Sequence, residues 1–233
     1  MDRDLGVTEA IRDFLPEWTV PVFEATALLG DLAVIVGVLG VVAALEVVRS
    51  VRRGSSEPLS ERTAFVLGVV LGGLALTLVL KTAFGFARPP EELQAVAREG
   101  DGFPSGHTMA ATILWGALAM WSRWGRRRWR VVGAAGIVGL VALSRLALGV
   151  HYLVDVLASI AFGVGFLALA ATVLARDPRR AFAVAAALGA LALAVTGASS
   201  DGLLAFAGCA GGAIGWWFLG RLRVRSLWAS VAR

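Results

Sequence analysis

The sequence predicts an all-α protein: a polytopic transmembrane helical bundle of six to seven spans, preceded by an amphipathic helix at the membrane interface. Hydrophobic side chains make up 58% of the 233 residues, against roughly 45–50% in an ordinary soluble domain. Several stretches run for about 17–25 residues with few charges, which is the length that a helix needs to cross ~30 Å of hydrocarbon. Short connections join these stretches, so we expect neighbouring helices to be antiparallel.

Residues 1–22 are predicted to form a separate interfacial segment. The stretch "MDRDLGVTEAIRDFLPEW" has neither a basic start nor an early apolar run, so it does not resemble a cleavable signal peptide. Its apolar side chains recur at helical spacing on one face, and these are Val7, Ile11, Phe14, Leu15 and Trp18. We therefore expect a short helix lying on the membrane surface. A plain polar leader is the alternative.

The transmembrane domain is predicted over residues 23–220 and contains seven candidate spans. These spans cover about 25–48, 62–86, 106–122, 130–149, 153–175, 181–197 and 203–220. The last two are rich in Ala and Gly, so a partly re-entrant segment is the alternative to two full spans over 181–220. The chain ends in a basic tail, 221–233.

The arginines predict the orientation in the cell membrane. Of the 22 basic residues, 16 lie in four segments: "RSVRRGSSEPLSER", "SRWGRRRWR", "RDPRR" and the tail "GRLRVRSLWASVAR". These are alternate connections plus the C-terminus, so the positive-inside rule assigns all four to the cytoplasm. The loop 87–105 and the turns near 149–152 and 197–202 then face the extracytoplasmic side. This distribution explains the net charge of +5 without a nucleic-acid partner, which we do not expect.

Neither a disulfide framework nor a metal cluster is indicated. Cys209 is the only cysteine, and it lies in an apolar stretch, where a packing role is expected. No group of residues has metal-ligand spacing, so we expect no metal and no other cofactor. The partner expected from composition is the bilayer, and the sequence does not indicate an oligomeric state.

Rare polar residues gather at the predicted outer ends of spans two to five. Lys81 is the only lysine and His107 and His151 are the only histidines. Arg88 and Arg145 lie on the same predicted side. Taken singly, an arginine at a span end is an interface anchor, and a Pro-Ser-Gly turn before a helix is a cap. Their convergence on one membrane face favours a shared site.

These residues suit phosphoryl transfer. Three cationic side chains, Lys81, Arg88 and Arg145, match a phosphate whose charge is spread over several oxygens. Ser105 and the Gly106 amide, at the N-terminus of the third span, add hydrogen bonds where a helix already favours anions. Such a cradle stabilises charge that develops in a transition state.

The two histidines suit two different roles. His151 and Asp155 are spaced i, i+4 and share one helix face, so the carboxylate can fix the tautomer of the imidazole and stabilise its cation. A neutral histidine is available as a nucleophile at ordinary pH because its unperturbed pKa is about 6.5. His107 then remains to protonate the leaving alcohol oxygen.

Three motifs occur in order: K-x6-RP from Lys81 to Pro89, PSGH from Pro104 to His107, and SR-x5-H-x3-D from Ser144 to Asp155. With them the chain resembles the type 2 phosphatidic acid phosphatase (PAP2) superfamily over a motif core of 81–155. The resemblance implies a metal-independent membrane lipid phosphatase with an outward-facing site. It also implies that His151 becomes phosphohistidine, with Asp155 orienting it and His107 as general acid. The implied phosphate-binding residues are Lys81, Arg88, Ser105, Gly106 and Arg145.

Three other functions remain open at this stage. An intramembrane serine hydrolase would use Ser105, His151 and Asp155, although acyl transfer does not need three cations. A non-catalytic phospholipid or anion carrier would explain the cations but not the histidines. A haloperoxidase, which also occurs within the superfamily, fits poorly with a membrane-embedded chain.

The sequence does not distinguish the substrate. Phosphatidic acid, phosphatidylglycerol phosphate, a polyprenyl phosphate or pyrophosphate, and a lysolipid phosphate all present a phosphate at the interface. The function predicted is therefore hydrolysis of a lipid phosphate monoester or pyrophosphate.

Overall fold

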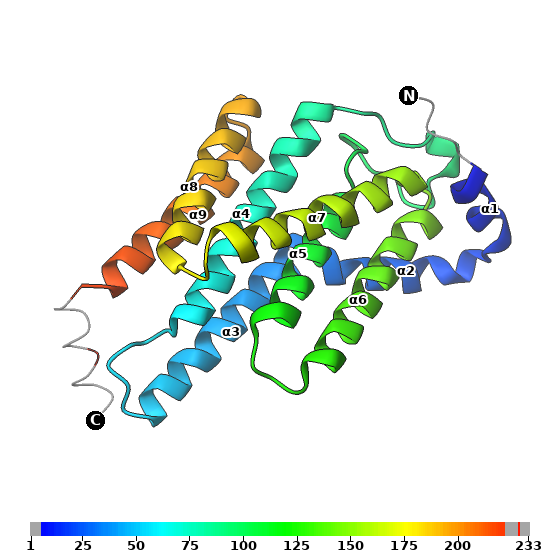
Figure 1. The fold of residues 1–233 in the computed structure, drawn as a ribbon. Helices are drawn as coiled ribbons and strands as arrows, with labels where there is room; N and C mark the ends of the chain where they lie inside the picture. Colours follow the sequence, from blue (N-terminus) through cyan, green and yellow to red (C-terminus); the bar gives the residue numbers. More distant parts are fainter. Residues whose placement is uncertain (1–5, 222–227, 229–233) are drawn as a thin grey trace. The chain divides into compact units, whose positions relative to one another are not determined.

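A computed structural model of the protein describes residues 6–221 and Trp228, and all regular structure within these residues is helical. The predicted all-α class is confirmed. The α-helices, drawn in Figure 1, are α1 (Gly6–Phe14), α2 (Val20–Ala27), α3 (Leu32–Arg52), α4 (Glu61–Phe84), α5 (Gly106–Trp121), α6 (Arg127–Ala147), α7 (Leu153–Val173), α8 (Pro178–Val195) and α9 (Ser200–Leu219). Most of the basic tail 221–233 lies outside the described residues.

Six of these helices are long and apolar enough to cross a membrane, namely α3, α4, α6, α7, α8 and α9. The remaining predicted span, 106–122, corresponds to α5, which has only 16 residues and would extend about 24 Å. The region 181–220 contains two separate helices of 18 and 20 residues rather than one re-entrant segment. The predicted domain boundaries at 22/23 and 220/221 stay predictions.

The chain divides into two compact units. The first comprises residues 1–35 and 77–167, of which 6–35 and 77–167 are described, and the second comprises 36–76 and 168–233. Helices α3, α4 and α7 each contribute residues to both. Every residue that the sequence assigns to the candidate site lies in the first unit.

The first predicted span begins later than the sequence indicates. Helix α2 ends at Ala27, a 3-10 turn covers Leu28–Gly30, and α3 begins only at Leu32. Asp31, between them, is extended (ψ 144°) and its carboxylate accepts a hydrogen bond from the Ala33 amide at 2.8 Å. An aspartate in this position caps a helix, so it ends one helix and starts another within an apolar run.

The core of the first unit lies between α5 and its neighbours. Ala111 of α5 packs with Val138 and Val141 of α6 and with the partly buried Leu29. The Trp115 indole also donates to the Leu29 carbonyl at 3.0 Å. The start of α5 is therefore surrounded by protein, as expected of a short helix that carries polar residues.

The N-terminal helix α1 packs on α6 (Figure 1). Ile11 contacts a cluster of Ala142, Leu146 and Val156, whereas Phe14 is 85% exposed. The predicted amphipathic helix is confirmed. Of its apolar side chains, Ile11 packs against the protein and Phe14 is exposed.

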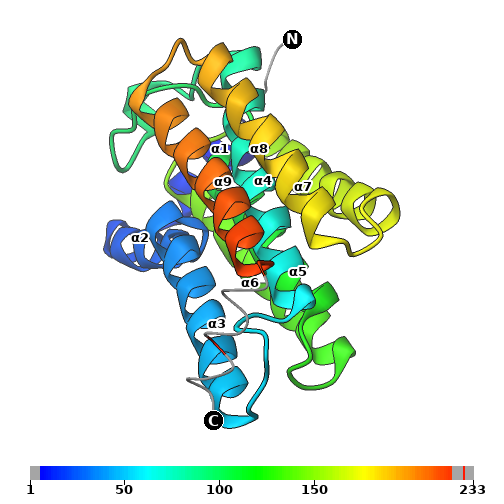
Figure 2. The same ribbon diagram turned by 90° about the vertical axis from the view of Figure 1, so that its left-hand side faces the viewer.

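In the second unit, α8 and α9 lie side by side (Figure 2). Cys209 of α9 is buried with Ala75 and Ala185, in agreement with a packing role. A Cβ on Gly68 would lie 3.0 Å from the Ala181 side chain, so small residues allow these helices to approach closely.

The turn between α6 and α7 requires glycine at one position. Gly149 has a φ of +70°, and a Cβ there would overlap the Leu93 carbonyl oxygen. The same turn accepts a hydrogen bond from the Ala95 amide at the Leu148 carbonyl, 3.0 Å. The loop after α4 is thus packed against the turn that follows α6.

We predict that Gly149→Ala destabilises the protein by at least about 2 kcal/mol, because a left-handed backbone and a backbone clash combine. Thermal denaturation in detergent, followed by circular dichroism, measures the effect. Gly139→Ala is the matched control, because nothing lies within 4 Å of a Cβ there. Equal melting temperatures for the two variants would contradict the prediction.

Candidate active site

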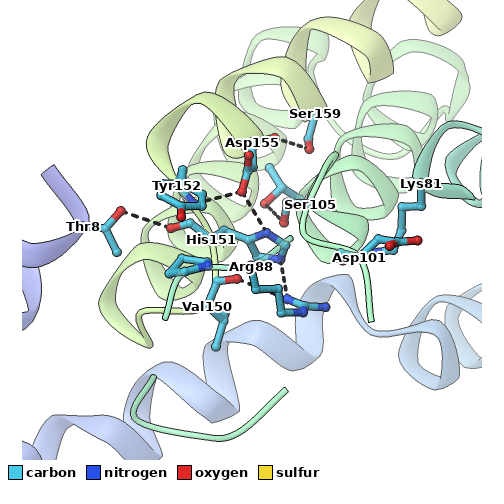
Figure 3. Close-up of polar contacts among 12 residues, drawn as sticks. Thr8, Lys81, Arg88, Asp101, Ser105, Val150, His151, Tyr152, Asp155 and Ser159 are labelled. Carbon is cyan, nitrogen blue, oxygen red and sulfur yellow. Dashed lines mark hydrogen bonds and ion pairs between the residues drawn. The ribbon is translucent and has the colours of Figure 1, made fainter. Parts of the chain in front are cut away.

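The predicted site residues come from helix ends and from the segments between them. Lys81 lies in the last turn of α4 and Arg145 in the last turn of α6. Gly106 begins α5, and Asp155 lies in the first turn of α7. Antiparallel neighbours place such ends together. Figure 3 shows Arg88, Ser105 and Asp155 around His151, and Lys81 beside Asp101.

His151 lies in the turn between α6 and α7 and is 1% exposed. Its Nδ1 is 3.5 Å from Asp155 Oδ2. On the other side of the ring, Nε2 lies 3.3 Å from Nη1 of Arg88. A guanidinium only donates, so Nε2 is the acceptor and the ring proton lies on Nδ1, facing the carboxylate.

Asp155 is held in place by its own helix and by the residue that precedes α5. Its Oδ2 accepts a hydrogen bond from the Tyr152 amide at 2.9 Å, which is one half of a capping box. Its main-chain oxygen accepts from the Ser159 hydroxyl at 2.6 Å and from the Ser105 amide at 3.5 Å. The orientation of His151 is therefore set by several elements at once (Figure 3).

The environment keeps His151 neutral. Burial and the nearby charges of Arg145 and Arg88, only partly opposed by the Asp155 carboxylate, lower the pKa of His151 to about 4. A neutral imidazole with its proton on Nδ1 leaves a lone pair on Nε2. That nitrogen is therefore the one that a neutral His151 has available for nucleophilic attack.

Arg145 is the most deeply buried cation among the described residues, at 1% exposure. Its Nε and Nη1 are buried and have no hydrogen-bond partner among the residues that the structure describes. Buried polar groups are nearly always hydrogen-bonded, and an unpaired buried charge is costly. Such a group fits an anion that presents oxygens to both nitrogens.

Arg88 and Lys81 complete the cationic cluster and also hold the loop beside it. Arg88 Nη1 donates to the Val150 carbonyl at 3.2 Å, and its Nε lies 3.2 Å and 3.1 Å from the carbonyls of Glu99 and Gly100. Burial, together with the neighbouring Arg98 charge, lowers the pKa of Arg88. Lys81 Nζ donates to the Asp101 carbonyl at 2.6 Å. Lys81 also interacts electrostatically with Arg88 and Arg145.

Ser105 occupies the N-cap position of α5, but its side chain makes no capping hydrogen bond. It is fully buried, and its hydroxyl lies 3.0 Å from the Thr108 hydroxyl. The Ser105 side chain therefore does not cap α5, which was the structural alternative to a role in the site. A Cβ on Gly106 would lie 3.7 Å from Lys81 Cδ, which brings this amide beside the lysine.

His107 is not hydrogen-bonded to the other site residues. It interacts electrostatically with Arg145, His151 and Arg88, and its Nε2 lies 3.8 Å from Asp31 Oδ2. The sequence assigned no partner to this histidine, and Asp31 was missed because it lies far away in the chain.

The contact of Thr8 with the site was also not predicted from the sequence. Thr8 is fully buried on α1, and its hydroxyl donates to the main-chain oxygen of His151 at 3.1 Å. The N-terminal helix therefore contacts the turn that carries the nucleophilic nitrogen (Figure 3). The only signal in the sequence is a polar residue near the apolar stripe of an amphipathic helix.

Within the described residues, no three side chains of His, Cys, Asp or Glu lie together in a way that could hold a metal ion. The site instead combines three cationic side chains, two imidazoles and the carboxylate of Asp155.

Comparisons with known proteins agree with this geometry. The PAP2 superfamily model matches residues 62–180, which is just over half of the chain. The chain belongs to the PAP2 superfamily. Its three motifs and the convergence of their residues in one unit are what this membership leads one to expect, and the resemblance drawn from the sequence is confirmed.

Two solved structures share the fold. One is a transmembrane PAP2-type phosphatidylglycerolphosphate phosphatase from Bacillus subtilis, 23% identical, with a TM-score of 0.60 over 71% of this chain and 81% of that one. The other is Aquifex aeolicus LpxE, 20% identical, with a TM-score of 0.57 over 73% of this chain and 95% of that one. None of the curated proteins searched matches the chain.

We predict that His151 stays neutral between neutral pH and about pH 5 and protonates only near pH 4, since its pKa lies below that of a free imidazole. The chain has two histidines, so in an untagged His107→Gln variant ring ¹⁵N NMR reports His151 alone. The expected spectrum is that of the Nδ1–H tautomer. Protonation near pH 6.5, or an Nε2–H tautomer, would contradict the geometry.

Proposed function

We propose that this member of the PAP2 superfamily is an integral membrane lipid phosphatase that hydrolyses a lipid phosphate monoester or pyrophosphate through phosphohistidine. The observation that carries the proposal is Arg145, whose buried Nε and Nη1 lack partners beside a nucleophilic nitrogen of His151. A phosphate provides the oxygens that such a guanidinium requires. In the proposal Lys81, Arg88 and the Ser105–Gly106 segment bind the remaining oxygens.

The first chemical step forms a bond between His151 Nε2 and phosphorus and breaks the bond between phosphorus and the lipid oxygen. The Nδ1 proton remains on the ring, and the Asp155 carboxylate stabilises the resulting charge. His107 supplies its proton to the departing oxygen as general acid. The products are a phosphohistidine and the free lipid alcohol, or the lipid monophosphate when the substrate is a pyrophosphate.

In the second step water attacks phosphorus and breaks the nitrogen–phosphorus bond. His107, now neutral, accepts a proton from this water, which regenerates both histidines and releases inorganic phosphate. Charge neutralisation in both transition states falls to Arg145, Arg88 and Lys81, whose positions do not have to change during the reaction.

The site is proposed to lie on the extracytoplasmic side of the cell membrane, with the C-terminus in the cytoplasm. The support is the concentration of arginines in alternate connections. Among substrates, phosphatidylglycerol phosphate is one candidate because a PAP2 protein of shared fold acts on it. Phosphatidic acid and polyprenyl phosphates remain equal candidates.

The test is phosphate release by purified protein in detergent, with EDTA present, from phosphatidic acid, phosphatidylglycerol phosphate and polyprenyl pyrophosphate. We expect turnover of at least one lipid, and loss of activity by about 10³-fold or more in His151→Ala, since removal of a nucleophile eliminates the covalent route. Thr172→Ala is a matched control, because this hydroxyl bonds only to carbonyls of its own helix.

The same assay separates the other functions. Turnover that survives in His151→Ala would overturn the phosphohistidine proposal. Binding of phosphate without turnover of any lipid would favour a carrier. Labelling by a fluorophosphonate that disappears in Ser105→Ala would favour a serine hydrolase.

A further inference from the structure

The two histidines of the site differ in what holds them. His151 is fixed by Asp155 on its own helix, and the motif makes that pairing visible in the sequence. His107 also needs a fixed ring, because a general acid must direct one nitrogen at the leaving oxygen in each turnover. Its partner comes from a segment outside the three motifs.

Asp31 provides that partner. Its Oδ2 lies 3.8 Å from His107 Nε2, and the two side chains are 37% and 28% exposed. This is an ion-pair distance across a partly solvated gap. A carboxylate so placed attracts the ring proton to Nε2, while the nearby charges of Arg145 and Arg88 act against a second proton on the ring.

The main chain around Asp31 is held against the start of α5. A Cβ on Gly30 would overlap the His107 carbonyl oxygen, so only glycine permits the approach. The Trp115 indole bonds to the Leu29 carbonyl at 3.0 Å. On its other side, the Asp31 carboxylate accepts from the Ala33 amide at 2.8 Å. Contacts of the residues before Asp31 and of Ala33 after it thus fix the carboxylate relative to His107.

The position of this break in the chain supports a functional role. An aspartate within an apolar run costs free energy, and the run from α2 to α3 would otherwise continue as one helix. The 3-10 turn Leu28–Gly30 and the extended Asp31 interrupt it. The interruption brings an acidic side chain to the one catalytic histidine that the motifs leave without a partner.

We propose that Asp31 is a positioning residue for His107, forming a second His–Asp pair that works opposite His151–Asp155. The inference rests on the proposed function. Asp31 holds the Nε2 proton of His107, so that Nδ1 carries the proton that goes to the leaving oxygen. After that transfer the Nε2–H tautomer remains, and Nδ1 is the base that accepts the proton of the attacking water.

The experiment compares two phosphates with the same chain length but different leaving groups, dodecyl phosphate and 4-dodecyl-2-nitrophenyl phosphate. The alkoxide of the first needs a proton in order to leave, whereas the nitrophenol of the second departs as an anion. The value of kcat/KM covers the steps up to departure of this group. Asp31→Asn is the variant, because asparagine caps a helix as well as aspartate does.

We expect Asp31→Asn to lower kcat/KM for dodecyl phosphate by about 10-fold or more and for the nitrophenyl phosphate by less than about 2-fold, since only the first requires general acid catalysis. Asp31→Ser, which keeps a capping side chain but has no carboxylate, should change the two kcat/KM values as Asp31→Asn does. In a His107→Gln background, Asp31→Asn should have no further effect. Asp13→Asn, at an exposed carboxylate of α1, is the control and should change neither rate.

Equal losses on the two substrates, or no loss on either, would overturn the role of Asp31. A further loss in the His107→Gln background would overturn the pairing. These results are distinct from failure of the proposed function, which would appear as hydrolysis of both substrates by His151→Ala.

Discussion

The burial of one guanidinium is the constraint on which the site depends. Arg145 lies in the last turn of α6 with almost no exposure, and two of its nitrogens find no acceptor within the protein. The cost of removing a charge from water is several kcal/mol per ion. A fold tolerates that cost where a ligand repays it, and a phosphate accepts hydrogen bonds from both nitrogens while neutralising the charge.

The same electrostatic environment fixes the chemistry of the histidine beside it. The cations that would attract a phosphate also disfavour a charged His151, and burial acts in the same direction. The imidazole is therefore neutral, with its proton directed at Asp155 and its lone pair on the side of Arg88. The cations that would bind an anion thus also keep the neighbouring imidazole neutral, which is the form that the proposed attack requires.

The parts of the structure that were predictable from sequence are those with local signals. Apolar runs and arginine-rich connections identify the helices, and i, i+4 spacing reveals the pairing of His151 with Asp155. The break at Asp31 was not visible because the apolar run continues through Leu28 and Leu29, and one acidic residue does not end a predicted span. The contact of Thr8 with His151 joins residues 143 positions apart, and no periodicity encodes it. The predicted span 106–122 forms the helix α5, whose 16 residues are fewer than those of the six long apolar helices.

The central claim is that the phosphoryl group is transferred to His151. Rapid acid-free denaturation of the protein during turnover of a ³²P-labelled lipid phosphate, followed by peptide mapping, tests it most directly. The account predicts a label that is stable in base and labile in acid, located on the peptide that contains His151 and absent from His151→Asn. A label on Ser105, or sustained turnover in which no labelled peptide forms even under rapid quenching, would contradict it.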